Sequence, residues 1–234
     1  DPDDFRRKVM EELRDALGMK VLPEHIECFD NSNIQGTNPV AACVVFRDSV
    51  PSKKDYRHFI IKTVVGANDY ASMKEVVNRR YSRMLAESPD DLPQLIVIDG
   101  GKGQLSFAYE ALAELGLTDK LTVIGLAERM EEVYRVGDPY PLFIDRNSQA
   151  LKVLQRIRDE AHRFGITHHR NRRSKAQVES ALREIKGVGE KTEQRLILHF
   201  GSVPRIASAS IEDLEALVGR VLAGKILKHL NKTN

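Results

Sequence analysis

The stretch LIVIDGGKGQL, at Leu95–Leu105, decides the fold class of this 234-residue chain. Its first four residues are all apolar, and a short run that is apolar on both faces is typical of a strand buried between helices in a sheet. Asp99 ends the run, two glycines follow, and the pattern over Gln104–Leu115 is helical. The stretch therefore predicts a buried strand, a tight turn and a helix, which is the alternation of an α/β protein.

The sequence on either side of this stretch predicts a mixed sheet flanked by helices. Strands are expected at His25–Asp30, Val40–Phe46, Tyr56–Thr63, Leu95–Ile98 and Leu121–Leu126, with a hairpin at Tyr134–Ile144. Helices are expected at Phe5–Met19, Asp69–Met84, Gln104–Leu115 and from Ser148 to about Arg163 or beyond. Short turns join the first three strands, which indicates an antiparallel meander at the start of the sheet.

The last third of the chain reads differently. A basic polar run, HHRNRRSK at His168–Lys175, contains no apolar residue and is typical of a linker. Beyond it, Leu182–Leu198 and Leu214–Leu230 each read as a helix, a glycine-containing turn and a second helix. We therefore expect an α/β domain at residues 21–167, a linker at 168–175 and a small all-α domain at 176–234. Residues 1–20 are expected to be a linker remnant or an N-terminal helix.

Composition excludes several classes of protein. No apolar run approaches 18 residues, so no membrane span is expected, and the charged N-terminus has no apolar core of a secretory signal. The net charge of +2 excludes a uniformly basic nucleic-acid protein but permits a local basic face. Aromatic residues make up 6% of the chain and Trp is absent, which argues against a broad base-stacking platform. Cys28 and Cys43 lie in strand-like segments, as expected of buried thiols in a reducing cytoplasm.

Two aspartates end predicted strands, Asp30 after HIECF and Asp99 after LIVI. Ligand sites of α/β sheets gather at the carboxyl ends of strands. Two carboxylates that meet there concentrate negative charge, which a hard cation such as Mg²⁺ offsets by taking oxygen ligands. The alternative is that each aspartate caps a turn, as aspartates before Asn or Gly commonly do. Two equivalent positions in one sheet leave these interpretations about evenly balanced.

His162 lies beside the apolar stripe of the last long helix of the α/β region, one turn from Arg158 and Asp159. At the edge of the core it is placed to bind a metal or to transfer a proton. The alternative is a structural histidine that is satisfied by Asp159.

Two glycine-rich turns are candidate phosphate contacts. The first is Gly100–Gln104, where Lys102 and the backbone amides of a helix N-terminus would form a phosphate-binding site. The second is the Gly-Val-Gly turn of the all-α region, whose exposed amides contact phosphate without reading bases. The candidate DNA-binding residues are Lys102, Lys186, Gly187, Val188, Gly189, Lys191, and Gly219 and Lys225 of the similar second turn. The alternative is that all of these are ordinary turns.

Several long runs resemble the C-terminal half of the bacterial UvrC family of excinuclease subunits. They are IECFDNSNIQGTNPVAACVVF at Ile26–Phe46, YRHF at Tyr56–Phe59, LIVIDGGKGQL at Leu95–Leu105, LQRIRDEAHRFGITHHR at Leu154–Arg170, IKGVGEKT at Ile185–Thr192 and HFGSVPRIASAS at His199–Ser210. The resemblance covers nearly everything after about Val21. Asn31-Ser32-Asn33 departs from the family, in which many members have a histidine at the third position. The turn at Leu217–Val221 has also lost the family's usual Pro-Gly-Ile-Gly pattern.

The resemblance implies an RNase H-like domain followed by a tandem helix-hairpin-helix domain. It implies a DNA endonuclease of nucleotide excision repair, within the SOS response to DNA damage, that cuts on the 5′ side of the lesion. It places catalysis on Asp30, Asp99 and His162, with Mg²⁺ or Mn²⁺ held by the two aspartates. It further implies damaged double-stranded DNA and UvrB as partners, a cytoplasmic location, and neither a membrane nor a small-molecule cofactor. The alternative function is a non-catalytic scaffold that grips the DNA backbone.

Overall fold

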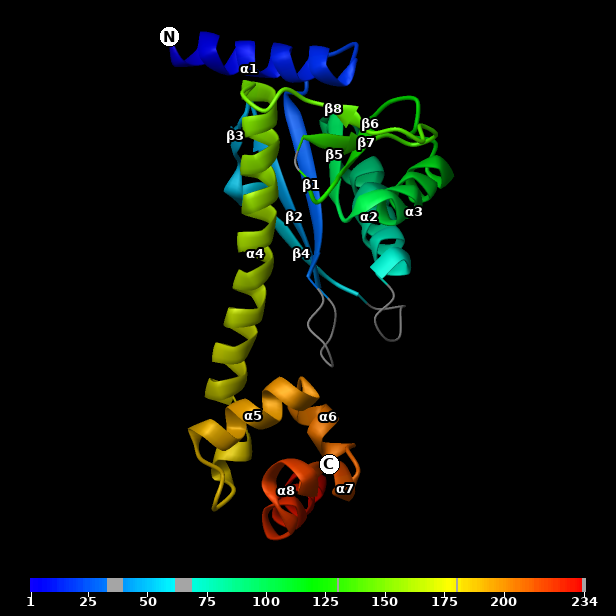
Figure 1. Cartoon of the computed structure of the whole chain (residues 1–234). Helices are drawn as coiled ribbons and strands as arrows, with labels where there is room; N and C mark the ends of the chain where they lie inside the picture. The colour runs from blue at the N-terminus through cyan, green and yellow to red at the C-terminus, as the bar shows by residue number, and fades with distance from the viewer. Residues whose placement is uncertain (33–39, 62–68, 130, 180, 233–234) are drawn as a thin grey trace. The chain divides into compact units, whose positions relative to one another are not determined.

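The computed structural model describes residues 1–32, 40–61, 69–129, 131–179 and 181–232. It divides into two compact units, a sheet unit that reaches Ile166 and a helical unit that begins at Thr167. Figure 1 shows the strands of the first unit and the short helices of the second. The predicted fold class, a mixed sheet flanked by helices and followed by a small all-α region, is confirmed.

One sheet forms the centre of the sheet unit, in the order β3-β2-β1-β5-β6-β7-β8, with β4 also paired to β2. The strands are β1 (His25–Ser32), β2 (Val40–Arg47), β3 (Val50–Pro51), β4 (Arg57–Ile60), β5 (Leu95–Asp99), β6 (Thr122–Leu126), β7 (Glu132–Tyr134) and β8 (Leu142–Phe143). β2 pairs antiparallel with β1, β3 and β4, which confirms the meander, whereas β1, β5 and β6 are parallel. β7 and β8 form the predicted hairpin.

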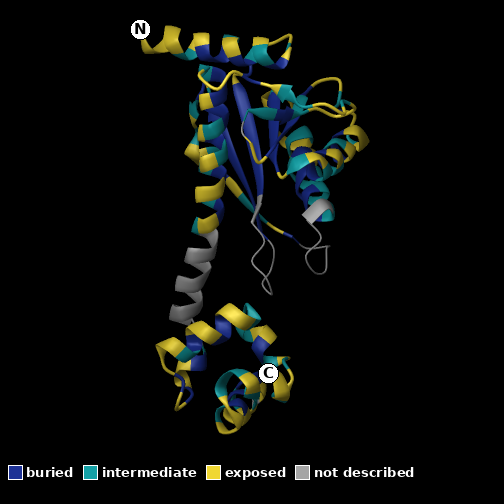
Figure 2. Ribbon diagram, in the orientation of Figure 1, coloured by how far each residue is buried: buried dark blue, intermediate teal, exposed yellow. Residues whose placement is uncertain are grey.

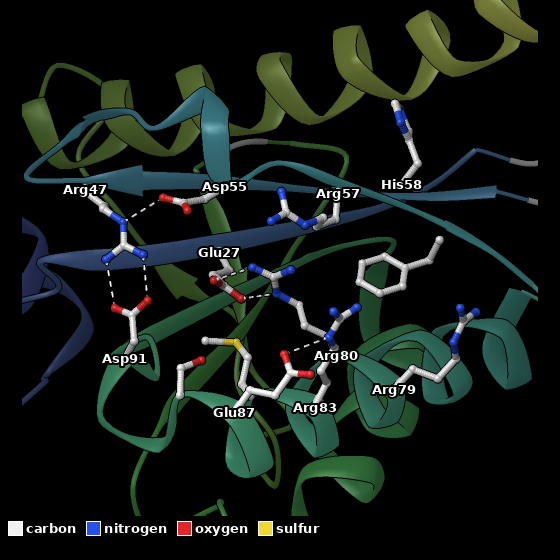
Figure 3. A pocket seen from close by; sticks show the side chains of 13 residues that line it. Glu27, Arg47, Asp55, Arg57, His58, Arg79, Arg80, Arg83, Glu87 and Asp91 are labelled. Carbon is white, nitrogen blue, oxygen red and sulfur yellow. Dashed lines mark hydrogen bonds and ion pairs between the residues drawn. The ribbon is translucent and has the colours of Figure 1, made fainter.

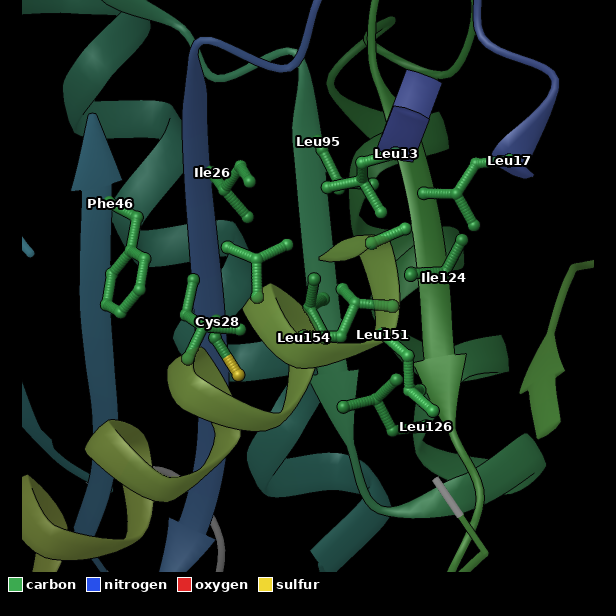
Figure 4. Close-up of a cluster of buried hydrophobic side chains, with 14 of the residues drawn as sticks. Leu13, Leu17, Ile26, Cys28, Phe46, Leu95, Ile124, Leu126, Leu151 and Leu154 are labelled. Atoms are coloured by element: carbon green, nitrogen blue, oxygen red, sulfur yellow. The ribbon is translucent and has the colours of Figure 1, made fainter. Parts of the chain in front are cut away.

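Helices cover both faces of this sheet. They are α1 (Pro2–Leu17), α2 (Asp69–Glu87), α3 (Gly101–Glu114) and α4 (Gln149–Glu179), with single 3-10 turns η1 (Lys53–Asp55) and η2 (Pro89–Asp91). The parts of α1 and α4 in the sheet unit pack on one face, around the apolar cluster of Figure 4, and α2 and α3 pack on the other. Figure 2 shows β1, β2 and β5 buried between these layers, which explains their near-continuous apolar sequences.

All four helices of the sheet unit differ from their predicted bounds, α1 and α2 by only two or three residues at an end. α3 begins at Gly101 rather than at Gln104, and α4 continues to Glu179, well past Arg163. The basic run at 168–175 therefore lies within the bounds of α4. α4 does begin as expected, because the hydroxyl of Ser148 accepts a hydrogen bond from the backbone N–H of Leu151, the pattern of an N-cap.

The helical unit is built from short helices around its own apolar core. They are η3 (Ala181–Glu184), α5 (Glu190–Phe200), α6 (Val203–Ala207), α7 (Ile211–Val218) and α8 (Arg220–Lys232). Their buried side chains include Leu182, Leu196, Ile206, Leu214 and Ile226. In the described residues of both units, no helix combines the length and the apolar character needed to cross a bilayer.

Candidate functional site

Asp30 and Asp99 are direct register partners on the parallel strands β1 and β5. Side chains alternate between the two faces of a sheet, so each aspartate shares a face with the residue two positions before it. Those residues, Cys28 and Val97, belong to the apolar cluster under α4. Both carboxylates therefore point toward α4, and both residues are buried, at 7% and 8% exposure. The sheet alone brings two negative charges side by side at the carboxyl ends of its central strands.

His162 of α4 lies against both carboxylates. Its Nδ1 is 2.9 Å from Oδ2 of Asp30, and its Nε2 is 2.8 Å from Oδ2 of Asp99. The helix positions the ring, because Ile157 and Ala161 are buried on the stripe that faces the sheet. Half of the imidazole side chain remains exposed to solvent. The structure thus brings together the three residues that the sequence singled out, with one ligand atom of each within 4.8 Å of the others.

Arg158 is a fourth member of this cluster that sequence reasoning did not assign to the site. Its Nε lies 3.2 Å from Oδ1 of Asp99, and its Nη1 donates a hydrogen bond to the carbonyl oxygen of Ala127. The signal was present, because Arg158 precedes His162 by four residues and so shares its helix face. Asp99 is thereby held between two side chains from successive turns of α4.

This donor set fits a hard divalent cation. Mg²⁺ and Mn²⁺ prefer oxygen ligands, and Mg²⁺ is usually held by one or two carboxylates with water in its other positions. Asp30 and Asp99 supply two carboxylates in register, while the half-exposed ring of His162 leaves the cluster open to water. The chemistry of the residues present therefore supports a metal site that is accessible to a ligand from solution.

A cavity of about 450 Å³ adjoins the cluster and is lined by Asp99, Arg158, Lys102 and Tyr134, among others. Nζ of Lys102 donates a hydrogen bond to the carbonyl oxygen of Pro139 and lies 5.2 Å from the centroid of the Tyr134 ring. Lys102 therefore lines the same cavity as Asp99, but its ammonium group is fixed against the β7–β8 connection.

The turn between β5 and α3 requires its glycines. Gly101 has φ of 84°, a conformation that only glycine adopts without strain. A Cβ on Gly100 would stand 2.2 Å from Oε1 of Gln104. That oxygen is buried and has no hydrogen-bond partner among the described residues. The turn is thus packed closely beneath the amide of Gln104, next to Asp99.

The Gly-Val-Gly turn lies between η3 and α5 in the helical unit. Gly187 has φ of 101°, and Gly189 is the N-cap of α5. The side chain of Val188 is buried in the apolar core, so this residue offers only its backbone to a ligand, while Lys186 and Lys191 are exposed. The turn is therefore anchored by Val188, and its flanking lysines face solvent.

The second turn lies between α7 and α8. Gly219, with φ of 87°, ends α7, and the exposed Lys225 lies on the second turn of α8. Residues 167–234 carry 13 Lys and Arg against 7 Asp and Glu, although the whole chain has a net charge of only +2. The positive charge of the protein is therefore concentrated in its C-terminal part, where both turns lie.

Comparison with known proteins agrees with this arrangement. Residues 14–166 match the family model described as UvrC RNAse H endonuclease domain, and residues 179–232 match a SAM-like helix-hairpin-helix tandem. Proteins named UvrABC system protein C are 56% identical in Flavobacterium johnsoniae, over 100% of this chain, and 54% identical in Porphyromonas gingivalis, over 99% of it. This chain spans about two fifths of those relatives, 39% and 38% of their lengths.

A solved structure of human ENDOV aligns with 71% of this chain and 99% of its own, at 10% identity and a TM-score of 0.36. That score is too low to support an inference about function. The segment that matches the endonuclease family model, residues 14–166, contains Asp30, Asp99 and His162. Because that match covers well over half of the residues, this chain belongs to the UvrC RNase H endonuclease domain family.

Proposed function

We propose that this chain is a divalent-metal-dependent DNA endonuclease that makes the 5′ incision of bacterial nucleotide excision repair. The observation that carries the proposal is the convergence of Asp30, Asp99 and His162, two in-register carboxylates and an imidazole, in a domain of an endonuclease family. Mg²⁺ and Mn²⁺ both suit these ligands, since both take oxygen and Mn²⁺ also accepts imidazole.

Each residue of the cluster has a role in this proposal. Asp30 and Asp99 hold the cation, which when bound supplies Lewis-acid activation of water and of the scissile phosphate. His162, whose two ring nitrogens face the two carboxylates, is either a third ligand or the group that carries a proton to or from the phosphodiester oxygens. Arg158 neutralises part of the charge on Asp99 and fixes its orientation.

DNA affinity belongs mainly to the helical unit in this proposal. Its exposed lysines beside two glycine turns suit phosphate contacts, and the amides of such turns read no bases. The substrate is damaged double-stranded DNA, and UvrB is the protein partner, as the relatives' name, a component of a UvrABC system, suggests. A cytoplasmic location is part of the same proposal, and both cysteines are buried free thiols, which suits it.

The deciding experiment combines metal binding with DNA nicking. A crystal soaked in Mn²⁺ is expected to show one or two ions touching Asp30 and Asp99. The Asp30→Asn variant is expected to lose Mn²⁺ binding and nicking while it binds a DNA duplex as the wild type does. Asp119→Asn, which changes an exposed aspartate in a turn, is the matched control. Nicking at the wild-type rate in Asp30→Asn would remove the metal assignment.

The same experiment separates the nuclease from a DNA-binding scaffold. A scaffold would bind the duplex with equal affinity in all three proteins, show no Mn²⁺ at the aspartates and nick in none of them. The carboxylates would then serve only as strand-end residues that pair with His162 and Arg158.

A further inference from the structure

A second cavity, of about 500 Å³, lies between α2 and the edge of the sheet formed by β2 and β4. Five arginines line it: Arg47, Arg57, Arg79, Arg80 and Arg83. In Figure 3 the guanidinium groups of Arg57 and Arg80 point into the middle of the cavity, whereas His58 points away from it. None of these arginines belongs to the cluster around the two aspartates.

The cavity lies on the opposite face of the sheet from Asp30 and Asp99. Arg57 is the register partner of Cys43, and the Cys43 side chain lies in the core cluster that packs against α2. Arg57 therefore projects toward α2, where Arg79 and Arg83 lie one turn apart on the same side of the helix.

Arg80 is held rigidly in this cavity. Its Nε and Nη2 donate to the two carboxylate oxygens of Glu27, at 2.5 and 2.7 Å, and its side chain is only 10% exposed. The hydroxyl of Tyr81 also donates to Glu27, and Nε2 of His25 lies 2.7 Å from the same carboxylate. The buried carboxylate, which makes four hydrogen bonds with three side chains, fixes the guanidinium of Arg80 before any ligand arrives, so little side-chain entropy is lost on binding.

The lining leaves one positive charge without a carboxylate. Four of the five arginines pair with a carboxylate: Arg80 with Glu27, Arg83 with Glu87, Arg47 with both Asp55 and Asp91, and Arg79 with Glu75, which lies outside the lining. Arg57 is the cation left over.

Nη1 of Arg57 donates only to the backbone carbonyls of Lys54 and Tyr56. Among the described residues, no carboxylate pairs with it, and its side chain is exposed. Its remaining N–H groups are therefore directed to solvent or to a ligand from outside.

We propose that this cavity binds a phosphate group of the DNA backbone, as a second contact on the face of the nuclease domain opposite the cleavage site. A guanidinium binds phosphate through two parallel hydrogen bonds, and one phosphodiester carries the single negative charge that would pair with Arg57. The proposal rests on the proposed function, because it takes DNA to be the substrate.

The occupant is a backbone phosphate rather than a base. Phe59 is the aromatic ring of the lining, and the guanidinium of Arg79 already covers it, 5.6 Å from the ring centroid. Stacking of a base on this ring would displace Arg79, which also donates to the carbonyl oxygen of Ile60. The contact should therefore be independent of DNA sequence.

The test measures the affinity of the whole chain for a short labelled duplex across a series of KCl concentrations, in EDTA so that no cleavage occurs. Arg57→Gln is expected to weaken binding and to lower the slope of log K against log[KCl] by about 0.9, the value for one lost phosphate contact. Arg7→Gln is the matched control, because it also removes one exposed arginine, on α1. It should leave the slope unchanged.

A second arm separates DNA from a free phosphate ligand. Titration calorimetry with inorganic phosphate measures binding to the wild type and to Arg57→Gln. If Arg57→Gln loses phosphate binding while the slope against KCl stays at the wild-type value, the DNA assignment is overturned. If neither measurement changes, the anion site itself is overturned. Both arms are independent of metal and cleavage, so a failure of the proposed nuclease activity would not alter either result.

Discussion

The imidazole ring of His58 stacks on the phenyl ring of Phe164, with ring centroids 3.8 Å apart and planes 12° apart. Nε2 of His58 is hydrogen-bonded to the backbone carbonyl oxygen of Phe164 at 2.7 Å. Just before β4, the hydroxyl of Tyr56 donates to Glu160 of α4, also at 2.7 Å. Glu160 and Phe164 flank His162, two residues before and two after it. The edge strand therefore fixes the turn of α4 that carries the histidine of the candidate site.

Removal of the Tyr56 and His58 contacts should make the position of His162 less fixed, while the carboxylates of Asp30 and Asp99 stay unchanged. Tyr56→Phe and His58→Phe each delete one hydrogen bond but keep an aromatic ring, so each should lower the free energy of unfolding by about 1 kcal/mol. Calorimetry should show weaker Mn²⁺ binding, and kcat for nicking should fall while KM for DNA stays constant. Tyr109→Phe is the control, because α3 packs on the opposite face of the sheet from α4. Wild-type Mn²⁺ affinity in both variants would show that the contacts serve stability alone.

The central fold was predictable because its strands carry strong local signals. The all-apolar run at Leu95–Ile98 predicted β5, and the Asp99 that ends it proved to be the register partner of Asp30. The start of α3 was misplaced because Gly101 and Gly103 are poor helix formers, so the sequence favoured a turn where the structure has the first turn of the helix. The end of α4 was left open beyond Arg163, and the run at 168–175 was interpreted as a linker, because a polar run gives no apolar periodicity.

The candidate site was predictable only in part, because sequence spacing does not reveal contacts between distant segments. The aspartates could be paired from the rule that ligand sites gather at strand ends. The predicted meander placed β4 beside β2, but no local pattern predicts that Tyr56 and His58 contact Glu160 and Phe164 of α4, more than a hundred residues later. The catalytic roles of Asp30, Asp99 and His162 stay predictions until they are measured.

Substitution of His162 separates a metal ligand from a structural residue. His162→Ala should abolish nicking and weaken Mn²⁺ binding, because neither a ligand nor a proton carrier remains. His162→Asp should keep partial activity in Mg²⁺, since a carboxylate is an ordinary ligand of that ion. His229→Ala, which removes a partly exposed histidine of the helical unit, is the control. A His162→Ala protein that nicks like the wild type would leave the histidine as a partner of the two carboxylates only.

The helical unit should account for much of the salt dependence of DNA binding. The Lys186→Gln, Lys191→Gln double variant removes two exposed cations beside the Gly-Val-Gly turn, so the slope of log K against log[KCl] should fall by up to about 1.8. Lys8→Gln on α1 is the control. Fluorescence anisotropy with duplexes of different sequence should show equal losses, because phosphate contacts carry no sequence information. A loss restricted to one sequence would indicate base contacts instead.

Glu27 should make the sheet unit sensitive to acid. Its burial raises the pKa, but hydrogen bonds from Arg80 and His25 and their charges outweigh that effect and lower the pKa from 4.5 to about 2. A lowered pKa means that the folded state gives up its proton more readily than the unfolded state. The stabilisation is complete above about pH 4.5 and is lost as the pH falls toward 2.

Glu27→Gln measures this contribution. Urea unfolding should give a lower free energy for the variant at neutral pH, and the difference should shrink between about pH 4.5 and 2 by roughly 3 kcal/mol at most. Glu11→Gln, on the exposed side of α1, should follow the wild-type curve. A difference that does not vary with pH would mean that Glu27 contributes through packing and not through its charge.

Glu193 of α5 is a buried acidic side chain in the core of the helical unit. The residue is fully buried, and neither carboxylate oxygen has a hydrogen-bond partner among the described residues. The guanidinium of Arg183 is 3.9 Å away, at the limit of an ion pair. A buried carboxylate without hydrogen bonds is destabilising, because water solvated it in the unfolded chain. Replacement by an apolar side chain of similar length should therefore stabilise this unit.

Glu193→Met is the sharpest form of that prediction. Met and Glu have similar helix propensities, so α5 itself should be unaffected, while the free energy of unfolding should rise by about 1 to 3 kcal/mol. Hydrogen exchange of the α5 amides measures the effect within the helical unit, whose unfolding need not coincide with that of the sheet unit. Glu190→Met, on the exposed first turn of the same helix, should give no such protection. Faster exchange in Glu193→Met would show that the carboxylate has a stabilising partner, such as a bound water or cation, that the substitution removes.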